Sequence, residues 1–212
     1  MKYTDVAWDF DGALYDSYPH INTDLQYVLL RHGLEVSLDE VNAQTRITQG
    51  HAFAHFAPLC GCSAEELKRE FKERKEGYLS DLCQPYPGIP ELLRDLHAAG
   101  IQNHICSNKQ PCNSKKYLDR DGLTPYFGVI SGVSEGIRRK PEPDMLNVVL
   151  KAQGIEPKAM LMIGDRLLDI EAAHNAGCDG CFFDPDRCNE KPADVEYEAY
   201  TAEELRKILL GE

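Results

Sequence analysis

The chain has 212 residues and carries 35 acidic against 23 basic side chains, a formal net charge of −12. This length allows one large domain or a domain with a sizeable insertion, and the negative surface field argues against binding to nucleic acid or to anionic membranes. No apolar run approaches the roughly 20 residues that cross a bilayer, and the N-terminus enters a strand without a secretory apolar segment, so we expect a cytoplasmic protein.

The first predicted element is a short buried strand at residues 6–8, an apolar run that ends at two acidic residues. Asp9 and Asp11 stand one residue apart, and Gly12 comes next. Two like charges this close repel each other unless a cation offsets them or one carboxyl is protonated. The segment therefore binds a metal ion, performs chemistry, or begins a solvated turn, because Asp and Gly are also common turn residues.

Residues 15–83 have the pattern of a small helical bundle. Apolar residues recur at helical spacing over 19–32, and capping-box patterns that begin at Ser37 and Ser63 predict two further helices. The helix that begins at Ser63 should extend through Leu79. Because this block interrupts the strand pattern, we expect it to be inserted into a sheet domain.

From Pro85 onward short strands alternate with helices, which predicts a parallel sheet with both faces covered. The later strands are expected at 102–106, 129–130, 159–163 and 181–183. A helix at 143–152 is expected before the third of these strands, and a helix at 168–175 before the fourth. The predicted fold class is therefore α/β, a Rossmann-like parallel sheet core formed by residues 1–14 and 84–212 with the helical block 15–83 inserted.

Polar side chains follow the later strands as well. Ser107 and Asn108 come directly after a strand and are neutral donors for an anion, although both also favour turns. Lys140 precedes a Pro-Glu-Pro segment, where a lysine can equally be a solvated surface residue. Asp165 and Asp169 are four residues apart at a predicted helix start, which places both on one face. Because ligands of parallel sheets bind at the carboxyl ends of the strands, we expect these side chains to share one site.

A carboxylate cluster beside a hydroxyl, an amide and a lysine is suited to magnesium-assisted phosphoryl transfer. The four polar stretches in order are Asp-Phe-Asp-Gly-Ala-Leu at 9–14, Ser-Asn at 107–108, Lys-Pro at 140–141 and Gly-Asp-Arg-Leu-Leu-Asp at 164–169. This series resembles the haloacid dehalogenase superfamily, in particular its phosphatase-type members with an inserted helical cap, such as phosphoglycolate phosphatases and β-phosphoglucomutase-like proteins. The resemblance covers nearly the whole chain.

The resemblance implies a magnesium-dependent phosphatase that hydrolyses a small phosphorylated metabolite through an aspartyl-phosphate intermediate. Asp9 would be the nucleophile, and Asp11 would protonate the leaving oxygen and then deprotonate the attacking water. Ser107 and Lys140 would bind the transferring phosphoryl group, with Asn108 helping to position it. The acid at Asp11 argues against the dehalogenase branch, because cleavage of a carbon–halogen bond needs no acid there.

The resemblance also implies the ligands of Mg²⁺. Asp9, the main-chain carbonyl of Asp11 and Asp165 would complete the shell around the ion. Asp169 would act on the water molecules of the metal or hold Lys140. We expect a monomer or a small homo-oligomer.

Two residues depart from the family's pattern. Ala13 replaces the usual threonine of the first motif and removes one hydroxyl near Asp11, so we expect slower or altered chemistry. Arg166 stands where a small polar residue is frequent. It could offset the acidic site or contact the substrate, but we prefer the interpretation that it is a surface arginine.

The helical cap would supply substrate specificity by closing on the site. Candidates for contacting the substrate are His20, Arg46 and Gln49, with Gly50 allowing a turn. Arg46 is the best candidate for binding a second anionic group on the substrate, as in a phosphorylated small acid, and it could equally be an exposed helix residue.

Three other functions stay open. A phosphomutase of the same family would use the same core but protect the aspartyl-phosphate from water, and isomer formation instead of phosphate release would reveal it. A phospho-accepting receiver also groups aspartates, a hydroxyl and a lysine around magnesium, but it lacks a helical insertion after its first strand. A non-catalytic binding protein is suggested only by Ala13.

Overall fold

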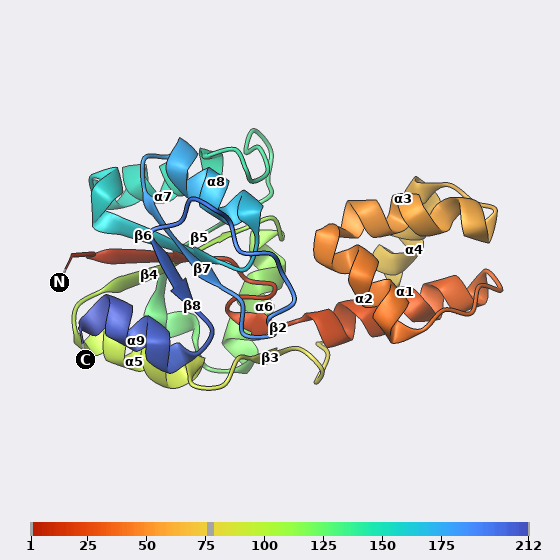
Figure 1. The fold of residues 1–212 in the computed structure, drawn as a ribbon, viewed down its shortest axis with the longest axis horizontal. Coiled ribbons are helices and arrows are strands. Elements are labelled where there is room, and N and C mark those ends of the chain that lie inside the picture. Colours follow the sequence, from red (N-terminus) through yellow and green to blue (C-terminus); the bar gives the residue numbers. More distant parts are fainter. Residues whose placement is uncertain (1, 76–78, 212) are drawn as a thin grey trace. The chain divides into compact units, whose positions relative to one another are not determined.

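The computed structural model describes residues 2–75 and 79–211, which divide into two units (Figure 1). One unit combines the chain up to Tyr15 with the chain from Pro85 onward, and the other consists of Asp16–Gln84. The chain passes between the units at two short paired strands, β2 (Tyr15–Asp16) and β3 (Gln84–Pro85).

The first unit is built on a sheet whose described residues form six parallel strands in the order β5-β4-β1-β6-β7-β8. The strands are β1 (Asp5–Trp8), β4 (Gln102–Ser107), β5 (Phe127–Gly132), β6 (Met160–Gly164), β7 (Asp179–Phe183) and β8 (Tyr197–Ala199). The strands β1, β6 and β7 are buried along their whole length, which explains why they read as short apolar runs without alternation. The prediction of an α/β fold with a parallel sheet is confirmed.

Helices cover both faces of this sheet (Figure 1). On one face, Met145, Val149 and Ala172 from α7 and α8 join Ala7 and Met162 of the strands in a buried cluster. On the other face, α5 and α9 pack against each other, and α5 also contacts β4. The helices of this unit are α5 (Ile89–Ala98), α6 (Pro111–Arg120), α7 (Asp144–Gln153), α8 (Leu167–Asn175) and α9 (Ala202–Leu210), with short 3-10 helices at Thr124–Tyr126 and Pro157–Ala159.

The second unit is helical throughout its described core. Its helices are α1 (Tyr18–Arg31), α2 (Leu38–Ile47), α3 (Gln49–Cys60) and α4 (Ala64–Lys75). Apolar side chains such as Leu29, Phe56 and Leu67 form a buried cluster between them. Ser37 makes the predicted capping box, in which its hydroxyl accepts from the Glu40 backbone and the Glu40 carboxylate accepts from the Ser37 backbone.

Several details differ from the sequence-based expectation. The helix predicted to run through Leu79 is wrong at its end, because α4 is helical to Lys75 and Leu79 lies outside it, whereas residues 76–78 fall outside the described part. Gly50 does not make a turn but lies within the first turn of α3. Among the described residues, none of the helices combines the length and apolar character that a membrane span requires.

Candidate active site

The pairing register of the central strands brings three strand ends level with one another. Trp8, the last residue of β1, pairs with Ile105 of β4 on one side and with Ile163 of β6 on the other. The backbone amide of Asp9 donates to the carbonyl oxygen of Ile163 over 2.8 Å. Residues that follow these three strands therefore meet at the carboxyl edge of the sheet, where parallel sheets bind their ligands.

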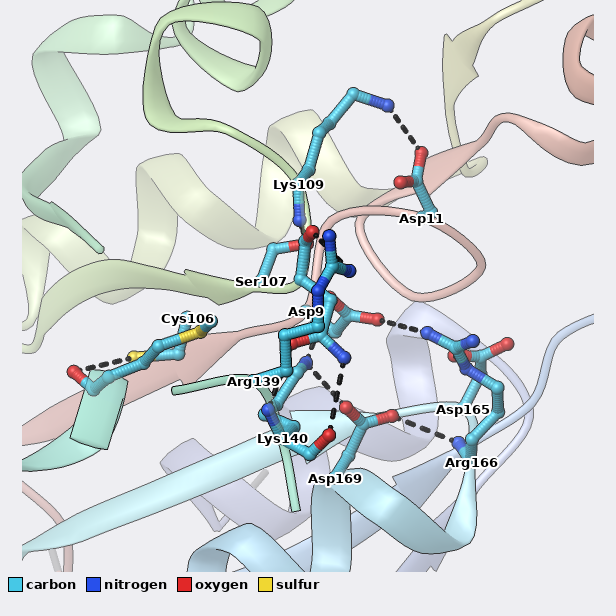
Figure 2. Close-up of polar contacts among 12 residues, drawn as sticks. Asp9, Asp11, Cys106, Ser107, Lys109, Arg139, Lys140, Asp165, Arg166 and Asp169 are labelled. Carbon is cyan, nitrogen blue, oxygen red and sulfur yellow. Dashed lines mark hydrogen bonds and ion pairs between the residues drawn. The ribbon is translucent and has the colours of Figure 1, made fainter. Parts of the chain in front are cut away.

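Lys140 lies between two buried carboxylates at this edge (Figure 2). Its Nζ atom is 2.9 Å from Asp9 Oδ1 and 2.5 Å from Asp169 Oδ1. The exposed fractions of these three side chains are at most 1%. A charge removed from water to this extent is tolerated only when opposite charges compensate it, so the three side chains depend on each other.

Asn108 fixes the backbone that presents Lys140. Its Oδ1 atom accepts from the Lys140 amide over 2.9 Å, and its Nδ2 donates to the Lys140 carbonyl over 3.4 Å. The neighbouring Ser107 is buried, and its hydroxyl contributes to lowering the pKa of the Asp9 carboxylate. Ser107, the last residue of β4, and Asn108, the residue after it, therefore lie beside Asp9 and Lys140 respectively.

Asp11 points away from this group toward Lys109 (Figure 2). The Lys109 Nζ atom donates to Asp11 Oδ1 over 2.7 Å, and it lies 4.8 Å from the centre of the Phe10 ring. Sequence reasoning missed Lys109, although its position directly after Ser107 and Asn108 was an available signal. The side chain of Asp11 thus has a cation of its own.

Asp165 and Asp169 complete the acidic part of the site. Carboxylate oxygens of Asp9, Asp165 and Asp169 all lie within 4.8 Å of one another. Asp165 Oδ2 accepts a hydrogen bond from the side-chain Nδ2 of Asn189 over 3.3 Å, a contact that sequence reasoning also missed. A side chain at Gly164 would meet Asp169 at 2.3 Å, so glycine is needed there for Asp169 to lie this close to the strand.

Arg166 lies among the same carboxylates. Its Nη2 atom donates to Asp9 Oδ2 over 3.4 Å, and its Nε is 3.5 Å from Asp165 Oδ1. Only 17% of the side chain is exposed. The preferred interpretation of Arg166 as a surface arginine is therefore wrong, because the side chain turns inward from the start of α8.

These contacts set the ionisation of the buried groups. Burial alone would raise the pKa of Asp9, but the charges of Lys140 and Arg166 outweigh it and hold that pKa below its ordinary value. Burial raises the pKa of Asp169, and the charge of Asp9 acts in the same direction. The pKa of Lys140 is raised, because the charges of Asp169 and Asp9 outweigh the desolvation that would lower it. These contacts therefore favour the ionised form of Asp9.

The residues present are suited to a divalent cation. Three clustered carboxylates are hard oxygen ligands of the kind that Mg²⁺ prefers, and their mutual distances allow one ion to contact all three. Among the described residues, the cluster of carboxylates does not include the side chain of Asp11. Any metal ligand from Asp11 would therefore be its main-chain carbonyl, as expected from the resemblance.

Arg46 is a residue of the helical unit. Its guanidinium carbon lies 3.6 Å from the centre of the Tyr18 ring, and its Nε donates to Asn42 Oδ1 over 3.4 Å. His20 is buried in the same unit, with its Nδ1 atom 3.2 Å from Asp24 Oδ2. The predicted roles of Arg46, His20 and Gln49 in substrate binding stay predictions.

Residues 6–183 match the family model of the haloacid dehalogenase-like hydrolases. The chain belongs to this family. A Pseudomonas aeruginosa N-acetylmuramic acid 6-phosphate phosphatase is 32% identical over 182 residues, which cover 84% of this chain and 80% of the relative. A Caulobacter vibrioides phosphoglycolate phosphatase is 31% identical, and the match covers 82% of this chain and 76% of the relative.

Solved structures of the family share the fold. A subfamily IA hydrolase from Geobacter sulfurreducens aligns with a TM-score of 0.77 at 24% identity, covering 98% of this chain and 97% of that chain. A haloacid dehalogenase-like protein from Streptococcus pneumoniae aligns with a TM-score of 0.82 at 18% identity and covers 98% of both chains. The prediction of a haloacid dehalogenase-like hydrolase of the phosphatase type is confirmed by this membership together with the phosphatase relatives.

Proposed function

We propose that this hydrolase is a magnesium-dependent phosphatase that hydrolyses a small phosphate monoester through a phosphorylated Asp9. The observation that carries the proposal is the position of Asp9, buried at the end of the central strand and 2.9 Å from the Lys140 ammonium. The names of the curated relatives support the phosphatase reaction.

In the first step an oxygen of Asp9 attacks phosphorus, and the bond from phosphorus to the leaving oxygen breaks. A carboxylate can attack only in its ionised form, which the lowered pKa of Asp9 favours at neutral pH. Lys140 and the Ser107 hydroxyl would bind the oxygens of the transferring group and stabilise their developing charge.

Asp11 would donate its proton to the leaving oxygen in this step. It then becomes a carboxylate, which is the state that the 2.7 Å contact with Lys109 stabilises. In the second step the ionised Asp11 accepts a proton from the water molecule that attacks phosphorus and releases Asp9. Lys109 therefore favours the form of Asp11 that the second step requires.

The metal ligands would be the carboxylates of Asp9 and Asp165 with the main-chain carbonyl of Asp11. When bound there, Mg²⁺ would supply positive charge that reduces repulsion between the carboxylate nucleophile and the phosphate dianion. Asp169, which contacts Lys140 and the Arg166 amide, would act by holding Lys140 in place.

The catalytic core in this proposal comprises residues 1–14 and 84–212, and residues 15–83 act as the cap that selects the substrate. The substrate class we favour is a phosphorylated small acid, for which Arg46 would bind the carboxylate. The names of both curated relatives, N-acetylmuramic acid 6-phosphate phosphatase and phosphoglycolate phosphatase, support this class because each substrate is an acid that carries a phosphate.

Phosphate release from a panel of phosphate esters, measured with Mg²⁺ and again with excess chelator, tests the proposal. We expect hydrolysis of a phosphorylated small acid in Mg²⁺ and loss of that hydrolysis in chelator. Isomers of the substrate in place of free phosphate would indicate a phosphomutase. Absence of turnover across the panel in Mg²⁺, or full turnover in chelator, would contradict the proposed function.

A further inference from the structure

Arg166 contacts Asp9 and Asp165, the two carboxylates that would bind the divalent ion. Its guanidinium reaches Asp9 Oδ2 at 3.4 Å and Asp165 Oδ1 at 3.5 Å, and both acids are buried (Figure 2). The arginine is attached at the edge of this cluster, at the turn between β6 and α8. The site therefore contains a second internal cation beside Lys140.

The local backbone explains why the side chain turns inward. Arg166 has extended backbone angles at the start of α8, and its amide donates to Asp169 Oδ2 over 3.1 Å. The next residue, Leu167, projects outward and is 54% exposed. The backbone of Arg166 is thus fixed by an acid of the site, whereas the long side chain carries the charge and can change rotamer.

The charges of the site indicate how the position of Arg166 affects the binding of a metal ion. Among five side chains of the site, the three carboxylates Asp9, Asp165 and Asp169 carry one more charge than the two cations, Lys140 and Arg166. A divalent ion that replaced the guanidinium would neutralise this group. A divalent ion that joined it would make the group positive and would repel the guanidinium at short range.

We propose that Arg166 is an internal competitor of the divalent ion for Asp9 and Asp165. It compensates the buried carboxylates when no ion is bound, and binding of the ion displaces the guanidinium from them. Affinity for the metal is lowered accordingly. This inference rests on the metal site of the proposed function, but it concerns metal affinity in the absence of substrate and not turnover.

Direct binding of Mn²⁺ to the substrate-free protein tests the competition, with the free ion measured by electron paramagnetic resonance. We expect Arg166→Ala and Arg166→Gln to bind Mn²⁺ at least about tenfold more tightly than the wild-type protein. Arg166→Lys retains the charge and should bind less tightly than either. Addition of free guanidinium ion should weaken Mn²⁺ binding to Arg166→Ala more than to the wild type.

Arg138→Ala is the matched control, because it removes one positive charge from an exposed side chain whose contacts are with Glu142 and Asp144. Its Mn²⁺ affinity should stay within about twofold of the wild type. Circular dichroism of each variant checks folding, and Arg166→Gln preserves much of the side-chain length if the alanine variant does not fold.

Equal or weaker Mn²⁺ binding in Arg166→Ala and Arg166→Gln would overturn the competition. If no variant binds Mn²⁺, both the competition and the proposed metal site fail. Tighter binding in the two variants without hydrolysis of any ester would support the competition and contradict only the proposed reaction. The two failures are therefore distinguishable.

Discussion

The Nζ atom of Lys140 lies 2.9 Å from Asp9 Oδ1, and neither side chain is exposed to more than 1%. This pair joins a residue that follows the first strand to a residue from the loop before α7. The same ammonium also contacts Asp169, so one cation compensates two buried acids. In the proposed mechanism, Lys140 would therefore serve both catalysis and stability.

Replacing Lys140 with Ala should lower both the stability of the fold and the catalytic rate. Loss of the ammonium leaves Asp9 and Asp169 with less compensation in a buried setting, which typically costs about 3–5 kcal/mol of unfolding free energy. It also removes a stabilising charge from the phosphoryl group, so kcat should fall by roughly a hundredfold or more. Urea unfolding and phosphate release measure the two effects, and an unchanged kcat in a folded variant would show that the lysine does not serve the reaction.

Asn108→Ala should reduce activity without removing any charge. Its amide holds the backbone of Lys140 through two hydrogen bonds, so its loss should let the lysine move away from the reacting group. We expect kcat to fall by about tenfold, because small displacements of a catalytic group have large effects. Mn²⁺ affinity should be unchanged in the same variant. A change confined to KM would instead place Asn108 directly on the substrate.

Arg46→Ala should affect substrates selectively. If Arg46 binds a carboxylate of the substrate, the variant should show a KM raised by roughly tenfold or more for phosphoglycolate and little change for ethyl phosphate, which lacks the carboxylate. The comparison of the two esters separates recognition from a general loss of activity. Equal effects on both esters would assign Arg46 a structural role through its contact with Tyr18.

Asp179 should make stability depend on pH. Burial alone would raise its pKa, but hydrogen bonds from Lys158, Lys2 and Tyr3 outweigh burial and hold that pKa well below its ordinary value. The stabilisation is therefore complete above the unfolded pKa of about 3.9 and is lost as the pH falls toward the folded value.

We expect Asp179→Asn to lower the unfolding free energy at pH 7 by about 1–3 kcal/mol, with a smaller difference from wild type near pH 2. Asp119→Asn is the control, since that acid is half exposed and pairs with Lys115 at the surface. Denaturant unfolding at the two pH values gives the comparison. A difference that grows at low pH would contradict the assigned direction of the pKa shift.

The centre of the sheet could be predicted because β1, β6 and β7 are buried along their whole length and read as apolar runs between helical segments. Polar residues directly after such runs reach the same edge, so the proximity of Asp9, Asp165 and Ser107 followed from chain order and the rules of parallel sheets. The three-residue strand β8 was missed because it is short and carries Glu198 at its centre. The helix after it had an available signal, a capping box from Thr201 to Glu204.

Other parts of the site depend on local geometry that residue patterns do not encode. Arg166 could have pointed outward as its neighbour Leu167 does, and its inward direction follows from the extended backbone at the start of α8. Lys109 reaches Asp11 across 98 positions of the chain, which only the folded register of β1 and β4 establishes. The direction of side chains at the strand ends therefore could not be predicted from the sequence.

The most direct test of the central claim is to quench the enzyme with acid during turnover of a phosphate ester and to map the phosphorylated peptide by mass spectrometry. We predict phosphate on Asp9 in the wild-type protein, and neither phosphate nor turnover in Asp9→Asn, which should remain folded because the amide is nearly the same size. Turnover by Asp9→Asn close to the wild-type rate, or phosphate on another residue, would contradict the account.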